Sequence, residues 1–287
     1  MTARSTPAPD PDRSWGGADL DLDAYLARIG YRGPLAPTEE TLRGLHRAHL
    51  AAIPFENVSV LLGEQPRLDL KSVQDKLVRR ERGGYCYEHN GLFAAVAERV
   101  GFGVACLAAR VSVGAHGLRP ATHVVLAVVD LQGMAWVADV GFGGTGLLEP
   151  IRLADGAREQ QGDRGFSVHR VDAGEWVLRT TTDEQTTDLY SFTLEPRYRV
   201  DHEVGNYYTA THPDSPFVRG LTAQRTSAGE RSVLRGTRLV TSRAGGEEAV
   251  ELAPAEVSTV LADVFGIVLE PAEAAALAGK VEAAAQD

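Results

Sequence analysis

Residues 82–90 read RGGYCYEHN: two glycines, a cysteine and then the polar first turn of a predicted helix. Paired glycines let the backbone turn sharply, and the N-terminal end of a helix stabilises a nearby negative charge. The thiolate of Cys86 should therefore be favoured, and the thiolate is the nucleophilic form of cysteine. An arbitrary cysteine is more often a small buried hydrophobic residue, but these neighbours favour a catalytic role. Cys106 lies in an apolar stretch and is interpreted as core.

Helices are predicted on both sides of this segment. Apolar residues recur at helical spacing over residues 22–29, and Thr38 can cap a second helix with one apolar face. That face carries Leu42, Leu45, His46 and His49. Ser72 and Asp75 resemble a capping box for a third helix. A further helix should cover about residues 88–99, so the N-terminal third of the chain is predicted to be helical.

The middle third consists of short runs rich in Val, Leu and Ala, separated by glycine, proline and aspartate, which is typical of strands. The predicted strands cover residues 104–113, 123–129, 134–140, 166–171 and 176–181. Near the C-terminus, two more predicted strands, 237–241 and 249–252, precede a helix that Pro254 opens. We therefore expect an α+β fold.

The composition limits the classes of function. The chain has 287 residues, 44% of them hydrophobic, which is enough for two or three packed units. A formal net charge of -10 argues against a nucleic-acid partner, because phosphate binding needs a clustered basic surface. No apolar run approaches the roughly 20 residues that span a bilayer, and residues 1–17 lack the apolar centre of a secretory signal. We expect a flexible leader over residues 1–17, no membrane partner and a cytoplasmic location.

A cysteine nucleophile needs a base, and His123 has the strongest claim among the eight histidines. It begins the predicted strand 123–129, which returns through a short loop into the strand 134–140. If that loop has an odd length, His123 and Asp139 lie on the same side of the sheet, and the carboxylate would orient the imidazole. Cys86, His123 and Asp139 would then form a catalytic triad. A one-residue slip in register would separate the last two, which would leave a strand-end histidine and a turn carboxylate.

Two other patterns suggest ligands. Residues 141–146, GFGGTG, match the dinucleotide-binding motif G-x-G-x-x-G and follow a predicted strand. That motif requires a helix to begin at once, whereas residues 147–151, LLEPI, contain a helix-breaking proline, so we expect a flexible loop. Cys86 and His89 have the spacing of a metal-ligand pair, but no second pair accompanies them, and no metal is expected.

The sequence resembles the arylamine N-acetyltransferases in several ordered motifs. Residues 82–90 look like the R-G-G-x-C-x-E-x-N signature of that family. Three other stretches are similar to family motifs in the expected order: IPFEN at 53–57, TH at 122–123 and DVGFG at 139–143. The likeness runs from about Leu20 to the end of the chain and is weaker after Asp183.

The resemblance implies three domains with a cysteine-protease-like arrangement of the triad. A helical N-terminal domain, residues 18–101, would carry the nucleophile. A β-barrel middle domain, residues 102–205, would carry the histidine and the aspartate, and an α/β C-terminal domain, residues 206–287, would form a lid. The implied activity is ping-pong transfer of an acetyl group from acetyl-CoA to an arylamine, arylhydrazine or arylhydroxylamine, as in xenobiotic metabolism.

The resemblance also implies roles for individual residues. Cys86 would be the nucleophile, His123 the base and Asp139 the orienting acid. Phe55 and Phe142 look like residues that line the acceptor pocket, where aromatic faces suit a planar ring, although core packing is the alternative for both. Two positions fall where family members approach the cofactor: Thr122 and Gly143.

A pair of opposite charges close to the nucleophile has two interpretations. Arg82 and Glu56 either form a buried ion pair that supports the turn at residues 83–84, or a solvated pair at the surface.

Three other functions fit part of the pattern. An amide synthase of the same family would close a macrolactam polyketide from a carrier-bound acyl chain with the same triad. A cysteine hydrolase also uses a cysteine, a histidine and an aspartate, but would pass its acyl group to water. A nucleotide-binding module would rest on residues 141–146 alone and would not need Cys86.

Overall fold

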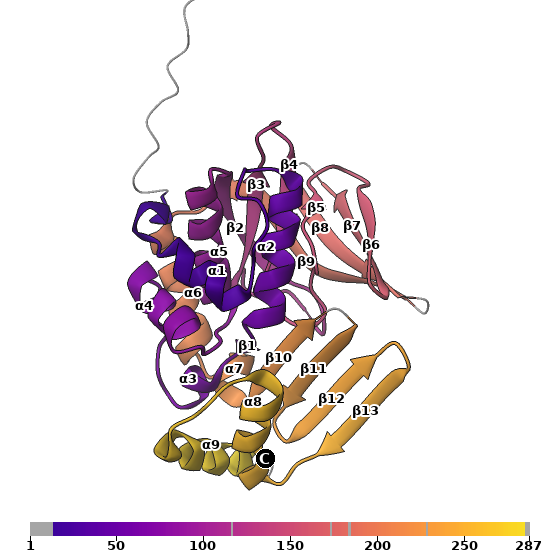
Figure 1. Cartoon of the computed structure of the whole chain (residues 1–287). Coiled ribbons are helices and arrows are strands. Elements are labelled where there is room, and N and C mark those ends of the chain that lie inside the picture. The colour runs from indigo at the N-terminus through magenta and orange to yellow at the C-terminus, as the bar shows by residue number, and fades with distance from the viewer. Residues whose placement is uncertain (1–13, 116, 173, 183–184, 228, 285–287) are drawn as a thin grey trace, which may run out of the picture.

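A computed structural model describes residues 14–115, 117–172, 174–182, 185–227 and 229–284 (Figure 1). The helices of its N-terminal third are α1 (Leu22–Ile29), α2 (Glu39–Ala52), α3 (Val58–Leu61), α4 (Leu70–Gln74) and α5 (Cys86–Val100). Residues 92–97 of α5 are all buried, so this helix is surrounded by protein on every side rather than presenting one apolar stripe. It forms the centre of the largest apolar core.

The start of α4 differs from the prediction. The capping box expected at Ser72 and Asp75 is wrong, because Asp69 caps this helix. The Asp69 carboxylate accepts hydrogen bonds from the backbone N–H of Ser72 at 3.0 Å and from its hydroxyl at 2.8 Å. Ser72 therefore lies inside the first turn as a donor, and the helix continues into a π-helical turn, Asp75–Arg79.

The predicted leader is partly described. Residues 1–13 lie outside the described residues, whereas residues 14–17 pack against α5. The Glu98 carboxylate accepts hydrogen bonds from the Ser14 hydroxyl at 3.1 Å and from the backbone N–H of Gly17 at 2.8 Å. Contacts with α5 therefore begin at Ser14, inside the predicted leader.

Eight strands form one antiparallel sheet in the order β5-β4-β3-β2-β9-β8-β7-β6 (Figure 1). They are β2 (Gly103–Val111), β3 (His123–Val129), β4 (Ala135–Ala138), β5 (Ile151–Arg152), β6 (Arg158–Gln161), β7 (Arg164–Arg170), β8 (Glu175–Thr181) and β9 (Thr186–Pro196). The chain after β5 approaches the opposite edge, because the N–H of Gly156 donates to the carbonyl of Val168 on β7 at 2.9 Å. The sheet is a nearly closed barrel around a second core, and the predicted α+β fold with a barrel is confirmed.

The register of β3 and β4 decides whether the predicted triad can form. Leu126 lies opposite Ala138 and Val129 lies opposite Ala135, so residues 130–134 form the connecting loop. The loop has an odd length, as the prediction required. Side chains alternate along a strand, so His123 and Asp139 face the same side of the sheet.

The C-terminal part combines a second sheet with four helices. The sheet has the order β1-β10-β11-β12-β13, with β1 (Phe55–Glu56), β10 (Thr222–Ser227), β11 (Glu230–Arg235), β12 (Arg238–Arg243) and β13 (Gly246–Glu251). The helices are α6 (Arg199–Thr211), α7 (Pro216–Arg219), α8 (Val257–Phe265) and α9 (Pro271–Ala284). Because β1 comes from the N-terminal third and pairs with β10, this sheet joins the N-terminal third to the C-terminal part. The domain boundaries at 101/102 and 205/206 stay predictions.

Candidate active site

A cleft of about 1210 Å³ opens between the barrel, the second sheet and the segment from α6 to α7. Five of the seven residues that were given site roles line it: Phe55, Cys86, Thr122, His123 and Phe142. Asp139 lies behind His123 and is 1% exposed. The cleft therefore gathers residues from all three parts of the fold.

Cys86 is the first residue of α5, as predicted, and is 4% exposed. Its Sγ lies 3.9 Å from the carbonyl oxygen of Thr122. Gly141 packs against it so closely that a β-carbon at position 141 would lie 2.8 Å from the Cys86 Cα. Only glycine allows the loop after Asp139 to come this near the cysteine.

His123 and Asp139 are joined directly: His123 Nε2 lies 2.7 Å from Asp139 Oδ2. Burial alone would lower the pKa of His123, but the Asp139 carboxylate and, further, the Cys86 side chain raise it to about 10. Burial alone would raise the pKa of Asp139, but the His123 imidazolium and hydrogen bonds from neighbouring groups lower it. At neutral pH the two residues are therefore an imidazolium and a carboxylate.

Asn90 holds the Asp139 carboxylate from the side of α5, a role that was not predicted. Its Nδ2 donates to Asp139 Oδ1 at 2.9 Å and to the Val124 carbonyl at 2.7 Å, and its Oδ1 accepts from the Val140 N–H at 3.0 Å. Asn90 follows Cys86 by four residues, the spacing that puts two side chains on one helix face. That spacing was the available signal in the sequence.

Aromatic rings form one wall of the cleft. The Phe142 ring centroid lies 5.3 Å from that of His123, edge to face, and 5.2 Å from that of Tyr190. The ring centroid of Phe55 lies 5.9 Å from that of Phe217 on α7. Phe217 was also missed as a lining residue, because nothing local brings residue 217 next to residue 55. Phe55 and Phe142 thus do border the cleft rather than only the core.

Arginines of the second sheet also line the cleft. Arg231, Arg235 and Arg238 line the cleft from β11 and β12. Arg231 Nη1 also donates to the Gly144 carbonyl at 3.1 Å. This contact holds the glycine-rich loop 141–146, which leads into no helix, as expected from LLEPI.

Gly143, whose role toward the cofactor stays a prediction, packs against a residue that lines the cleft. A β-carbon at Gly143 would be 2.7 Å from Gln224 Oε1, so this glycine packs on β10. Its neighbour Gly144 lines the cleft and donates its backbone N–H to the same Gln224 oxygen.

The pair of Arg82 and Glu56 is buried. Arg82 Nε lies 3.8 Å from Glu56 Oε1, and the two side chains are 4% and 0% exposed. Arg82 Nη1 also lies 3.3 Å from Glu273 Oε1 on α9. The pair is therefore buried, as the first interpretation has it. Arg82 directly precedes the glycines at 83–84, and Glu56 reaches it from β1.

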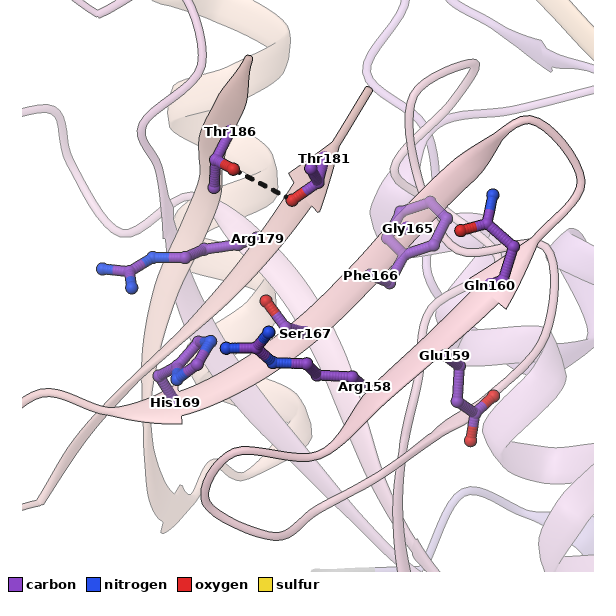
Figure 2. A pocket seen from close by; sticks show the side chains of 10 residues that line it. All are labelled: Arg158, Glu159, Gln160, Gly165, Phe166, Ser167, His169, Arg179, Thr181 and Thr186. Atoms are coloured by element: carbon purple, nitrogen blue, oxygen red, sulfur yellow. Dashed lines mark hydrogen bonds between the residues drawn. The ribbon is translucent and has the colours of Figure 1, made fainter. Parts of the chain in front are cut away.

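A second hollow, of about 490 Å³, lies on the outer face of β6, β7 and β8 (Figure 2). Arg158, Ser167 and His169 gather there, and Thr181 and Thr186 share a hydrogen bond at its edge. It contains neither cysteine and shares no lining residue with the cleft. The nucleophile chemistry therefore belongs to the cleft.

Within the described residues, no group of three or more His, Cys, Asp and Glu side chains is arranged to hold a metal ion. In the same part of the chain, no helix has the length and apolar character needed to cross a membrane.

Comparison with known proteins places this geometry among acetyltransferases. The family model described as N-acetyltransferase matches residues 38–274. The arylamine N-acetyltransferase of Mycobacterium tuberculosis H37Rv is 41% identical over 256 residues, which cover 86% of this chain and 89% of that protein. The crystal structure of the Nocardia farcinica arylamine N-acetyltransferase superposes with a TM-score of 0.90 at 44% identity, covering 96% of this chain and 99% of that one. The Mycobacterium marinum enzyme in complex with CoA superposes with a TM-score of 0.82 at 38% identity, covering 92% and 98%.

Proposed function

Because this chain belongs to the arylamine N-acetyltransferase family, we propose that it transfers an acetyl group from acetyl-CoA to an aromatic amine through a thioester on Cys86. The observation that supports this most is the 2.7 Å bond between His123 and Asp139 beside a cysteine that begins a helix. An imidazolium beside the cysteine stabilises the negative charge that the sulfur carries as the attacking nucleophile.

The first half-reaction acetylates the enzyme. The Cys86 thiolate attacks the carbonyl carbon of acetyl-CoA, the new C–S bond forms, and the bond to the CoA sulfur breaks. His123 gives its proton to the leaving CoA thiolate and becomes neutral. The backbone N–H of Cys86, at the N-terminus of α5, is the proposed donor to the oxyanion.

The second half-reaction restores the starting state. The nitrogen of an arylamine, arylhydrazine or arylhydroxylamine attacks the acetyl carbonyl, and the bond to Cys86 breaks. The nitrogen gives a proton to His123, which becomes an imidazolium beside the released thiolate. Asp139 holds the ring in place through both steps and stabilises its charged form.

The walls of the cleft suit both substrates. Phe55 and Phe142, together with Phe217, offer aromatic faces to a planar acceptor. Thr122 and the loop 141–146 border the proposed path of the cofactor, and the arginines of β11 and β12 suit its phosphates. A cytoplasmic location is part of this proposal.

Intact-protein mass spectrometry tests the proposal. With acetyl-CoA, the wild-type chain and Cys106→Ala should each gain one acetyl group, whereas Cys86→Ala should gain none. An arylhydrazine should then discharge the adduct much faster than buffer does. A wild-type chain that gains no acetyl group would contradict the donor, and rapid loss without an amine would favour a hydrolase.

A further inference from the structure

Three buried histidines lie around the candidate triad without belonging to it. His46, His49 and His89 are each at most 1% exposed. The rings of His46 and His49 both pack edge to face on Phe93, with centroids 5.7 Å away. A buried imidazole is costly unless both of its nitrogens find partners, so those partners indicate what each ring holds.

His49 and His89 belong to a hydrogen-bonded chain that ends at the backbone before Phe55. His89 Nε2 lies 3.1 Å from the Pro54 carbonyl oxygen, which can only accept, so this nitrogen carries the proton. His89 Nδ1 must then accept from His49 Nε2, at 2.9 Å. His49 Nδ1 in turn accepts from the Tyr25 hydroxyl, also at 2.9 Å. In this series of three hydrogen bonds, each donor therefore lies on the side away from Pro54 and each proton points toward the Pro54 carbonyl.

The Pro54 carbonyl is in contact with the turn that precedes the nucleophile. It also accepts from the Gly84 N–H at 3.4 Å, and the Glu56 N–H donates to the Gly84 carbonyl at 2.8 Å. Residues 54–56 and 83–84 thus lie side by side, with Cys86 two residues further on. A group that fixes the position of the Pro54 carbonyl therefore also fixes the position of the turn at residues 83–84.

His46 makes the corresponding contact on the other side of the triad. Its Nδ1 lies 3.0 Å from the Leu148 carbonyl oxygen and must donate to it. Its Nε2 then accepts the backbone N–H of Asp139 at 3.2 Å. Its proton is therefore on the opposite nitrogen from those of His49 and His89.

All three rings are neutral at physiological pH. Burial lowers the pKa of His46 and of His89 to about 4, and lowers that of His49 well below its usual value. The tautomers deduced from the partners are therefore the ones present when the enzyme works.

We propose that His46 and His49, one helical turn apart on α2, are positioning residues that set the spacing between the nucleophile and its base. His46 holds the backbone of Asp139, and thereby His123. His49, acting through His89, holds the Pro54 carbonyl and the turn before Cys86. One face of α2 thus aligns both halves of the triad, which is an inference that rests on the proposed function.

The tautomers can be measured directly in the full-length chain. Long-range ¹H–¹⁵N correlation spectra of ¹⁵N-labelled histidine should show a proton on Nδ1 of His46 and on Nε2 of His49 and His89. Signals are assigned by their loss in single histidine-to-glutamine variants. None of the three should titrate between about pH 6 and 8. The opposite tautomer at His46, or titration of any of these rings in that range, would overturn the proposal.

The alkylation rate of Cys86 tests the positioning role. Iodoacetamide is used at pH 7 in a Cys106→Ala background, so that one thiol remains. His46→Leu and His89→Leu should each slow alkylation about tenfold, because a small displacement of reacting groups has large kinetic effects. His89→Gln should recover most of the rate, since its amide can still donate toward Pro54.

A matched control separates positioning from stability. The control is Leu45→Ala. Leu45 is buried on the same helix, and its side chain has no polar atom that could form a hydrogen bond. This variant should lower the melting temperature but leave the alkylation rate unchanged. Leucine variants that melt early and yet alkylate like Leu45→Ala would show that the histidines are only core residues. Should a leucine variant fail to fold, the glutamine variant and the wild-type spectra decide.

Neither measurement uses acetyl-CoA, so the two proposals fail separately. A chain with these tautomers and alkylation rates that forms no acetyl adduct would reject the donor and keep the positioning role. Normal acetylation of the wild type, together with unchanged alkylation rates in the leucine variants, would keep the acetyl-CoA donor and reject the positioning role.

Discussion

Gly83 packs so closely against Pro54 that a β-carbon at position 83 would lie 2.1 Å from the Pro54 carbonyl oxygen. No pair of non-bonded atoms approaches that closely without displacing backbone. Neither Gly83 nor Gly84 has a positive φ. The paired glycines before Cys86 are therefore required by close contact between backbones rather than by a left-handed turn.

Gly83→Ala should consequently be severe. We expect it to lower the free energy of unfolding by about 3 kcal/mol, because overpacking against backbone cannot relax cheaply. Urea denaturation measures this. Gly91→Ala is the matched control, because nothing lies within 4 Å of its new β-carbon. It should raise the free energy of unfolding by about 0.5–1 kcal/mol, as alanine does in a helix. Equal effects of the two changes would contradict the close contact.

Asp139→Asn should change how stability depends on pH. The pKa of His123 is raised to about 10 in the folded chain, so the stabilisation from its imidazolium is complete below its ordinary value of about 6.5. That stabilisation is lost as the pH rises through about 10. The free energy of unfolding of the wild type should therefore fall over this range, by at most about 5 kcal/mol.

Asparagine removes the charge that holds the proton on His123, so the fall should disappear in Asp139→Asn. Urea denaturation at a series of pH values gives both curves. Asp163→Asn, whose side chain is 85% exposed, is the control and should follow the wild type. Parallel curves for Asp139→Asn and the wild type would contradict the ion pair. Acetyl transfer by Asp139→Asn should fall by about two to four orders of magnitude.

Asn90→Ala should weaken both the fold and the site. It leaves the Asp139 carboxylate, the Val124 carbonyl and the Val140 N–H without their amide partner. Buried groups left unpaired cost about 1–3 kcal/mol in total stability, which thermal or urea unfolding detects. Acetylation of Cys86 should slow as well, because the carboxylate loses one support. Wild-type kinetics in a destabilised Asn90→Ala chain would limit Asn90 to a structural role.

Arg43→Met should destabilise the chain by about 1–3 kcal/mol. Arg43 is 19% exposed and bonds Glu149 at 2.8 Å and Glu159 at 2.9 Å, which ties α2 to the barrel. Hydrogen bonds to these glutamates outweigh burial and raise its pKa, so it stays charged. Arg47, 57% exposed, bonds Glu149 alone among the described residues, and Arg47→Met should cost no more than about 0.5 kcal/mol. Urea denaturation compares them, and similar losses would contradict the dependence on burial.

Phe217→Leu should raise KM for an aromatic amine about three- to tenfold while leaving the rate of Cys86 acetylation within about twofold of the wild type. The reason is that Phe217 packs against Phe55 at the proposed acceptor wall, and its ring partners among the described residues are Phe55 and Tyr85 rather than His123. Steady-state and single-turnover kinetics separate the two steps. Phe166→Leu, in the barrel core, serves as the control and should leave KM unchanged. An unaltered KM in Phe217→Leu would remove this residue from the acceptor pocket.

Features that depend on near neighbours could be predicted from the sequence alone. The N-terminal position of Cys86 on its helix follows from the glycines before it and the apolar period after it. The same-side relation of His123 and Asp139 follows from the parity of one short loop, because side chains alternate along a strand. The absence of a helix after residues 141–146 follows from the proline in LLEPI.

Features that depend on distant partners could be found in the three-dimensional arrangement but not in the sequence. His46 and His49 appear in the sequence as part of an apolar helix face, and nothing local says that their nitrogens reach Asp139 and, through His89, Pro54. Likewise, nothing local places Gln224 of β10 against Gly143 and Gly144, where a β-carbon would lie 2.7 Å and 2.9 Å from its Oε1. The physical reason is that hydrogen bonds and close contacts between elements are set by where the cores bring the backbones together, and no short-range periodicity encodes that placement.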